Sequence, residues 1–298
     1  MIPLERFLQL PTAEVAALVR ASGPKVCVFP FNGTRRWFLL EHSVENQREL
    51  ASTYVEATIR GYIRLYRMLF DHGIETVVAP VFGKDILERG EEYMTAIGET
   101  MSFFTDHPEF VSFYKDYDVR VRFYGDYRKE FKTRYPQIVQ AFDRGTELAL
   151  AHGRHRLLYG VFANDATQTI AELSIQYYKT HKRPPGSAEL IEMYYGERIE
   201  KADIFIGFER FTVFDYPLLN TGEESLYFTV APSLYMTETL LRKILFDYIY
   251  LRPLPEPDYG RMPEDALEAM RRVYLDGREK AFGVGVVKSG IWYARSYE

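Results

Sequence analysis

Short apolar segments alternate with longer amphipathic segments along most of this 298-residue chain. The apolar segments are six or seven residues long and rich in valine, isoleucine and phenylalanine, which is typical of buried β-strands. Alternation of such strands with helices predicts an α/β domain with a central, mostly parallel, six-stranded sheet flanked by helices. The predicted strands comprise residues 25–31, 76–82, 119–124, 157–162, 203–208 and 225–230.

Helical spacing of apolar residues predicts six helices between and after these strands. They comprise residues 45–72, 86–105, 127–156, 164–181, 188–195 and 237–250. No repeat or long linker divides the chain, so we predict a single domain over residues 1–298 with its core at about residues 20–250. Residues 251–298 form a C-terminal extension, in which residues 281–287 and 291–294 are predicted to pair as a β-hairpin.

Charge and cysteine content exclude several classes of protein. With 42 acidic and 37 basic side chains the net charge is −5, so the chain lacks the excess of positive charge that is typical of nucleic-acid-binding proteins. The single cysteine, Cys27, lies in an apolar run and is interpreted as a buried strand residue rather than a nucleophile. No apolar run reaches the ~18 residues of a membrane span, and the N-terminus does not resemble a signal peptide. We therefore predict a cytoplasmic protein without a transmembrane segment.

A small polar turn follows the first predicted strand, where open parallel sheets bind their ligands. Gly33 allows the backbone to approach an anion closely, and Arg35 and Arg36 offer forked donors suited to phosphate. The residues alone support two interpretations, a phosphate or diphosphate site and a solvated loop with two surface arginines. The turn comprises Asn32, Gly33, Thr34, Arg35, Arg36 and Trp37.

This turn resembles the Asp-Gly-Asn-Gly-Arg-Trp signature of the cis-prenyltransferase superfamily, which includes the undecaprenyl diphosphate synthases. Other blocks resemble that family in the same order and together cover about residues 20–250. They are Phe82 to Arg89, Val119 to Asp126, Asp203 to Thr212 and Leu226 to Thr229.

The resemblance is stronger to one divergent branch, the tuberculosinol and tuberculosinyl-adenosine synthases with the related kolavelool synthases. It extends over nearly the full chain and rests on specific runs of residues. They include Phe29-Pro30-Phe31, Gly33 to Trp37, His72 to Thr76, Phe123 to Tyr127, Tyr227 to Ser233 and Phe282 to Gly285.

The chain also departs from the chain-elongating enzymes of the superfamily, which bind two diphosphates. The acceptor site of those enzymes needs an arginine cluster. In this chain only Arg210 and Thr212 remain as partial counterparts of that cluster. Ser225 stands where those enzymes carry a glutamate that helps to hold magnesium, and Ile86 replaces an asparagine used in condensation. The resemblance therefore implies one surviving diphosphate site and an enzyme that ionises a single prenyl diphosphate.

The resemblance also implies roles for individual residues. Arg35, Arg36, Arg89 and the backbone of Gly33 would bind the diphosphate, with Thr34 in the same turn. Aromatic faces would stabilise the carbocation, and the candidates are Trp37, Tyr54 and Tyr93. Tyr54 aligns with a catalytic tyrosine that helps to activate the incoming nucleophile. The alternative interpretation of all three aromatic residues is that they are ordinary residues of the hydrophobic core.

Asn32 is the main discrepancy, because both the superfamily and the close branch carry aspartate there. That aspartate coordinates magnesium or assists proton removal, whereas asparagine is a poor metal ligand and no general base. Three interpretations stay open: an engineered inactive variant, an enzyme with a weakened dependence on Mg2+, and a catalytically silent protein. The resemblance implies Mg2+ as the cofactor, and Asn32 marks the place of its ligand but is doubtful as a ligand itself.

The leading hypothesis is a diterpene synthase that ionises a bicyclic C20 diphosphate of the halimane or clerodane type. Water would quench the cation to give an alcohol, with tuberculosinyl or kolavenyl diphosphate as the substrate. One alternative transfers the same group to adenosine, another is a non-catalytic partner subunit, and a third is a chain-elongating prenyltransferase. The resemblance further implies a homodimer to which the C-terminal segment contributes.

Overall fold

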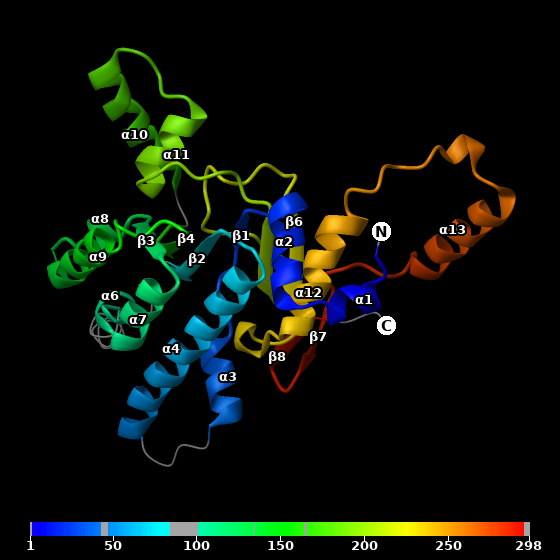
Figure 1. Ribbon diagram of the computed structural model, residues 1–298, viewed down its shortest axis with the longest axis horizontal. Coiled ribbons are helices and arrows are strands. Elements are labelled where there is room, and N and C mark those ends of the chain that lie inside the picture. Colours follow the sequence, from blue (N-terminus) through cyan, green and yellow to red (C-terminus); the bar gives the residue numbers. More distant parts are fainter. Residues whose placement is uncertain (1, 43–46, 84–100, 134, 164–165, 295–298) are drawn as a thin grey trace.

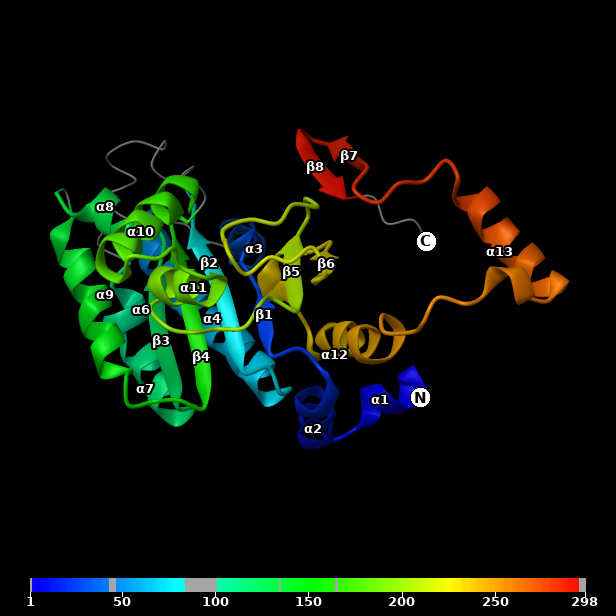
Figure 2. The ribbon, with the colours of Figure 1, turned by 90° about the horizontal axis from the view of Figure 1, so that it is seen from above.

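A computed structural model describes residues 2–42, 47–83, 101–133, 135–163 and 166–294. At its centre lies a six-stranded sheet in the order β3-β4-β2-β1-β5-β6, in which every neighbouring pair is parallel. Helices cover both faces of this sheet (Figures 1 and 2). The predicted fold class, an α/β domain with a central six-stranded sheet, is confirmed.

The six strands lie close to the predicted ranges, and the C-terminal hairpin is present as an antiparallel pair. The strands are β1 (Val26–Val28), β2 (Thr76–Phe82), β3 (Val119–Tyr124), β4 (His155–Val161), β5 (Ile204–Phe208), β6 (Ser225–Thr229), β7 (Gly285–Lys288) and β8 (Ile291–Ala294).

The helices include several that the sequence did not predict, at the N-terminus, between β1 and β2 (α3), between β2 and β3 and in the C-terminal extension. They are α1 (Leu4–Gln9), α2 (Thr12–Ser22), α3 (Thr34–Glu41), α4 (Gln47–Asp71), α6 (Phe103–Asp106), α7 (Pro108–Asp116), α8 (Tyr127–Phe131), α9 (Pro136–Leu148), α10 (Ala166–His181), α11 (Ser187–Tyr195), α12 (Glu238–Phe246) and α13 (Glu264–Gly277). Most of the predicted helix 86–105 lies outside the described residues. Short turns add η2 (Ser233–Tyr235), the π-helical η3 (Asp247–Leu251) and η4 (Tyr259–Arg261). None of the described helices is both long and apolar enough to cross a bilayer.

Two hydrophobic cores, one on each face, bury the central strands completely. Cys27 of β1 belongs to the larger core, which also takes side chains from α4, α7, α9 and α12. Val26 and Val28 point to the opposite face and join a smaller core with residues of α11. Burial, and then the charge of Asp203, raise the pKa of the Cys27 thiol. These features support the interpretation of Cys27 as a buried strand residue.

Two prolines account for differences between the predicted and observed elements. β1 ends at Val28 rather than at residue 31 because Pro30 has no N–H with which to continue the ladder. The predicted helix 127–156 is broken into α8 and α9 at Pro136, which occupies the first position of α9. Tyr135, the residue before it, has φ −137° and ψ 54°, outside the helical region, as expected before proline.

The C-terminal extension leaves the body of the protein after α12. Both views show α13 lying away from the central sheet, and Figure 2 shows the β7–β8 hairpin beyond β6 (Figures 1 and 2). No residue of α13 is buried. The assignment of one domain to residues 1–298 stays a prediction from the sequence.

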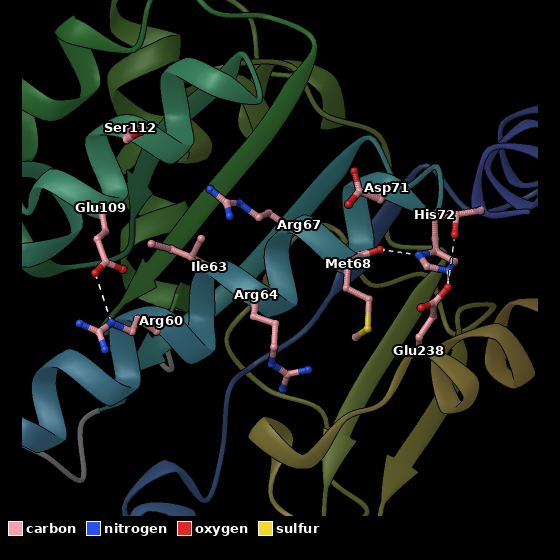
Figure 3. Close-up of a pocket in the computed structure, with 11 residues that line it drawn as sticks. Arg60, Ile63, Arg64, Arg67, Met68, Asp71, His72, Glu109, Ser112 and Glu238 are labelled. Atoms are coloured by element: carbon pink, nitrogen blue, oxygen red, sulfur yellow. Dashed lines mark hydrogen bonds and ion pairs between the residues drawn. The ribbon is translucent and has the colours of Figure 1, made fainter.

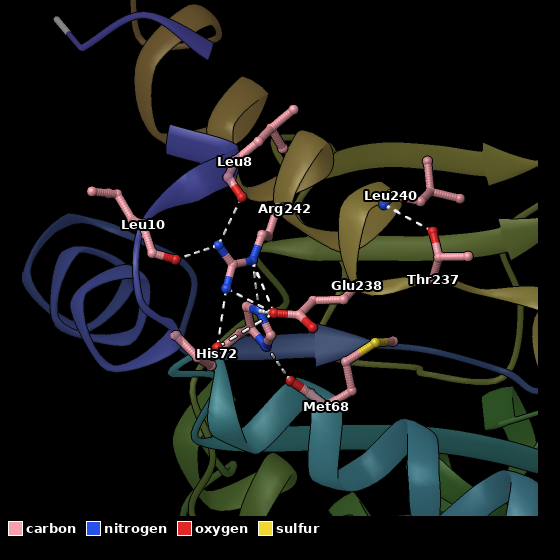
Figure 4. A network of polar contacts seen from close by, with 9 residues as sticks. Leu8, Leu10, Met68, His72, Thr237, Glu238, Leu240 and Arg242 are labelled. Atoms are coloured by element: carbon pink, nitrogen blue, oxygen red, sulfur yellow. Dashed lines mark hydrogen bonds and ion pairs between the residues drawn. The ribbon is translucent and has the colours of Figure 1, made fainter. Parts of the chain in front are cut away.

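A buried arginine on α12 joins the N-terminal helices to the rest of the fold (Figure 4). Arg242 is 6% exposed and donates to the carbonyl oxygens of Leu8 (3.0 Å) and Leu10 (2.6 Å), which flank the end of α1. It also donates to the hydroxyl of Thr12 at 3.0 Å and to the carboxylate of Glu238 at 2.7 Å. A buried cation of this kind is stable because its donors are satisfied from several elements.

We predict that Arg242→Met lowers the free energy of unfolding by about 3–5 kcal/mol, because Glu238 and two part-buried carbonyl oxygens lose their partner. Arg261→Met is the matched control, since Arg261 is 89% exposed and pairs with Asp258 in solvent. The control should change stability by less than about 1 kcal/mol. Urea unfolding of both variants measures the difference. Equal losses in the two variants would show that the network does not anchor the N-terminal helices.

Candidate active site at the carboxyl edge of the sheet

The turn after β1 is tied to the chain that follows β6. The N–H of Asn32 donates to the hydroxyl of Ser233 at 3.0 Å, and the N–H of Ser233 donates to the carbonyl of Asn32 at 3.0 Å. The Ser233 hydroxyl also lies 3.4 Å from the carbonyl of Pro30. In the described part of the chain, the half-buried amide of the Asn32 side chain has no hydrogen-bond partner. The backbone is therefore fixed while the side chain is left available to a ligand.

Gly33 sits at the N-cap of α3 with φ 74°, in the left-handed region. A Cβ atom there would lie 2.8 Å from the ring of Phe208 and 3.0 Å from Cβ of Pro232, so only glycine fits. No side chain caps this end of the helix and no acidic residue occupies its first turn. Free N–H groups and the positive end of the helix dipole make such a terminus suitable for an anion.

Thr34 connects this helix start to α4. Its buried hydroxyl donates to the carbonyl of Phe31 at 3.2 Å and lies 3.3 Å from the hydroxyl of Tyr62. Burial, and then the neighbouring Tyr54, raise the pKa of Tyr62 well above its ordinary value. Tyr62 therefore stays neutral, and Tyr54 lies close enough to interact with it electrostatically.

Arg36 is held by residues at the end of β5. Its two terminal nitrogens donate to the two carboxylate oxygens of Glu209 at 3.0 and 3.3 Å. The guanidinium also lies 5.3 Å from the centre of the Phe208 ring, in a cation–π contact. A guanidinium carries five N–H donors, so three remain after the pair with Glu209. Arg35, next to it, is exposed, and no hydrogen bond or ion pair within the described ranges involves its side chain.

Trp37 and Tyr54 join one aromatic cluster through residues that the sequence did not single out. The ring of Phe38 lies 5.2 Å from Tyr54 in an edge-to-face contact and stacks on His42 at 4.5 Å. Trp37 contacts the same His42 at 5.5 Å. Of the three predicted aromatic candidates, Trp37 thus belongs to α3, which begins at the candidate site, and Tyr54 packs against the same helix.

Two predicted residues, Arg89 and Tyr93, lie outside the described residues, as does Ile86. Sequence reasoning missed four others that shape the site: Phe208, Glu209, Ser233 and Tyr62. Only the place of two of these residues in the sequence could have indicated them. Phe208 ends a predicted strand, and Ser233 lies in a run of residues that carried the resemblance. Glu209 also adopts a positive φ of 65°, a conformation that cannot be recognised in the sequence.

The donor set at Asn32 does not fit a metal held by the protein. The described residues contain no group of three His, Cys, Asp or Glu side chains that could hold an ion. Asn32 offers one neutral oxygen, and Glu209 is paired with Arg36. Ser225, where the resemblance led us to expect a carboxylate, begins β6 at the opposite edge of the sheet. We therefore derive no step through Mg2+.

A separate cavity of about 610 Å³ lies along the outer side of α4 (Figure 3). Arg60, Arg64 and Arg67 line it, but Asp71, Glu109 and Glu238 balance their charge. Asp71 and Glu238 belong to the ends of α4 and α12 that meet the buried Arg242 network, away from the turn at Asn32. This cavity does not form part of the candidate site.

Comparison with known proteins adds to this geometry. No protein-family model matches the chain. It is 48% identical over 301 residues to the tuberculosinyl adenosine transferase of Mycobacterium tuberculosis (strain CDC 1551 / Oshkosh), with 99% of each chain covered. The chain belongs to the family of this transferase. It is also 23% identical over 306 residues to the (+)-kolavelool synthase of Herpetosiphon aurantiacus, covering 98% of this chain and 96% of that protein.

Solved structures show the same fold. Lavandulyl diphosphate synthase from Lavandula x intermedia, in complex with dimethylallyl diphosphate, matches with a TM-score of 0.60 at 15% identity, over 83% of this chain and all of that one. A probable undecaprenyl diphosphate synthase from Campylobacter jejuni gives 0.57 at 13% identity, over 79% of this chain and 98% of that one. The predicted resemblance to cis-prenyltransferases and to the tuberculosinyl branch is confirmed, and membership of this family supports an enzymatic role.

We predict that Gly33→Ala lowers the free energy of unfolding by about 2–3 kcal/mol, through left-handed backbone strain and the contact with Phe208. Gly290→Ala is the matched control, because Gly290 has φ 77° but a Cβ atom added to it would meet nothing within 4 Å. The control should lose only the backbone part, about 1–2 kcal/mol. Titration with inorganic diphosphate should show weaker binding for Gly33→Ala alone. Equal stability and equal binding in both variants would contradict the close approach.

Proposed function

We propose that this protein transfers a bicyclic C20 diterpenyl group, of the halimane or clerodane type, from its diphosphate to adenosine. The supporting observation is the 48% identity over 99% of both chains to a protein named for that reaction. A second candidate, quenching of the same cation by water, is supported by the 23% identity to a (+)-kolavelool synthase. The structural neighbours contribute the fold alone.

The proposed mechanism begins with binding of the substrate diphosphate at the start of α3. The N–H groups of the first turn, with Arg35 and the three remaining donors of Arg36, supply positive potential there. As the allylic C–O bond breaks, its electron pair leaves with the diphosphate, and these groups stabilise the charge that develops. Arg89 is proposed to contribute to the same site.

The allylic cation requires groups that stabilise positive charge without reacting with it. The aromatic faces of Trp37 and Tyr54 are proposed for this role, each worth roughly 0.5–2 kcal/mol depending on desolvation. Tyr54 is further proposed to orient the incoming nucleophile, and Tyr93 to complete the aromatic wall.

The two candidate nucleophiles differ in their need for a base. A ring nitrogen of adenine forms the new C–N bond with its own lone pair, and because it carries no proton, none is released. Water forms a C–O bond and must then lose a proton to an acceptor. Asn32 is a neutral amide and cannot accept that proton. With Asn32 at this position, water therefore lacks a base there, whereas adenosine needs none.

We predict that Asn32→Asp raises diphosphate release by about 10²–10⁴-fold, because a carboxylate stabilises the adjacent cation and accepts a proton. Purified protein with Asn32 or with the aspartate is incubated with tuberculosinyl or kolavenyl diphosphate, with and without adenosine. Diphosphate release gives the rate, and product mass separates the nucleoside from the alcohol. The aspartate variant should also give more alcohol relative to nucleoside.

Arg36→Met in both backgrounds is the control, and it should abolish release if the activity belongs to this site. An unchanged rate on Asn32→Asp would contradict the role assigned to this position. Alcohol alone, whether or not adenosine is present, would favour the water-quenching candidate. No product and no binding of either prenyl diphosphate, even with the aspartate, would favour the non-catalytic partner subunit.

The extension formed by residues 251–294 is proposed to mediate a homodimer. Apolar residues recur along one side of α13 at positions 266, 267, 270, 273 and 274, the spacing of a helix that packs on a partner. Val273 and Tyr274 are 68% and 66% exposed, and Phe282, beyond the helix, is 89% exposed. A second copy of the chain is the proposed partner, and the cytoplasmic location stays a prediction from the sequence.

We predict that Val273→Asp shifts the protein from dimer to monomer, because a charge in an apolar contact is left without a partner. Sedimentation velocity over a range of concentrations measures the change. Arg272→Ala, a change of the adjacent exposed arginine, is the control and should leave the dimer in place. A monomer at all concentrations for the unmodified chain would contradict the proposal.

A further inference from the structure

A second cavity, of about 380 Å³, opens on the face of the sheet occupied by the smaller core. One wall is the start of α10, and the other is the loop of residues 213–220 that follows β5. Ala163, two residues beyond the end of β4, also lines it, so the cavity lies at the same carboxyl edge as the turn at Asn32. Its volume falls within the range of pockets that bind small ligands, about 300–1,000 Å³.

The loop wall is held in a strained conformation. Asp215 and Leu218 have positive φ values of 61° and 67°, a region that side chains rarely occupy. Buried tyrosines fix the loop from beneath: the hydroxyl of Tyr124 donates to the carbonyl of Asp215, and that of Tyr195 to the carbonyl of Pro217, each at 2.7 Å. Such strain persists only where surrounding contacts impose it, and it is concentrated at ligand-binding walls.

The lining suits a neutral, flat, partly polar ligand. Phe214, Ile170 and Leu218 supply apolar surface. Asn220 is exposed at the rim, and no hydrogen bond within the described ranges occupies its side-chain amide. Among the described residues that line the cavity there is no Lys or Arg, while Asp215 is acidic, so a diphosphate is disfavoured.

The same loop also reaches the diphosphate site. It leaves β5 at Glu209, which forms the paired hydrogen bonds with Arg36, and continues directly to residues 213–220. One short segment thus has an arginine at one end, paired with Glu209, and an apolar cavity wall at the other, at Phe214.

We propose that this cavity binds the nucleoside acceptor, with the adenine ring between Phe214 and Ile170 and its edge at Asn220. An asparagine amide can donate to N7 and accept from the N6 amino group of adenine at once, which gives specificity for this base. The inference rests on the proposed transfer to adenosine and names the site of that acceptor.

The first test uses a large side chain to fill the cavity. Ile170→Trp should weaken adenosine binding at least ten-fold, as measured by calorimetry on the full chain without prenyl diphosphate. Ile175→Trp is the matched control, because Ile175 lies on the same helix and is 56% exposed. The control should bind adenosine as the unmodified chain does.

The second test concerns the base. Asn220→Ala should weaken adenosine binding about ten-fold and remove most of the preference for adenosine over inosine, which has an oxygen in place of the N6 amino group. This loss of preference separates recognition at Asn220 from a general loosening of the loop. Circular dichroism confirms that each variant is folded.

Equal adenosine affinity in Ile170→Trp and Ile175→Trp would overturn the assignment of the cavity, and so would failure of the unmodified chain to bind adenosine at millimolar concentration. Failure of the proposed function is distinguishable, because it appears as absence of the nucleoside product in the turnover assay. Weaker adenosine binding in Ile170→Trp and Asn220→Ala supports the assignment of the cavity independently of turnover.

Discussion

The exchange of hydrogen bonds between Asn32 and Ser233 brings the ends of three strands to one point. Asn32 follows β1 and Ser233 follows β6, while β5 lies between these two strands in the sheet. The ring of Phe208, at the end of β5, packs against Gly33 inside this closure. The start of α3 is thereby fixed relative to the whole carboxyl edge, which a helix of eight residues could not achieve by its own propensity.

The pairing of Arg36 with Glu209 orients positive charge at the site of a chain whose net charge is negative. A chain of charge −5 has no general attraction for an anionic substrate, so positive potential must be concentrated at the site. Glu209 neutralises part of that charge, but it also fixes the plane of the guanidinium and leaves three of its donors for a ligand. Orientation of the donors before binding reduces the entropy lost when the diphosphate binds.

The sequence predicted those parts of the fold that depend on local periodicity. Alternating apolar segments located all six strands, and the glycine and arginines after the first strand identified the turn at which α3 begins. Contacts between distant segments could not be predicted in the same way. Glu209 is an ordinary acidic residue in the sequence, and only the parallel pairing of β1 with β5 places it opposite Arg36. Ser233 depends likewise on β6 lying beyond β5.

The separation of charge along the loop after β5 bears on how a single active site can handle two unlike substrates. The diphosphate requires arginines and free N–H groups. An uncharged base requires apolar surface and a few neutral hydrogen-bonding groups, without a buried cation left unpaired. Glu209 and Phe214 lie five positions apart in the sequence, so one short segment can serve both requirements. Tyr124 and Tyr195 fix the continuation of this segment, at the carbonyls of Asp215 and Pro217, to the core. A transferase that binds both substrates converts a bimolecular step into an effectively unimolecular one, which is its main advantage over free solution, and binding of the acceptor beside this loop would serve that end.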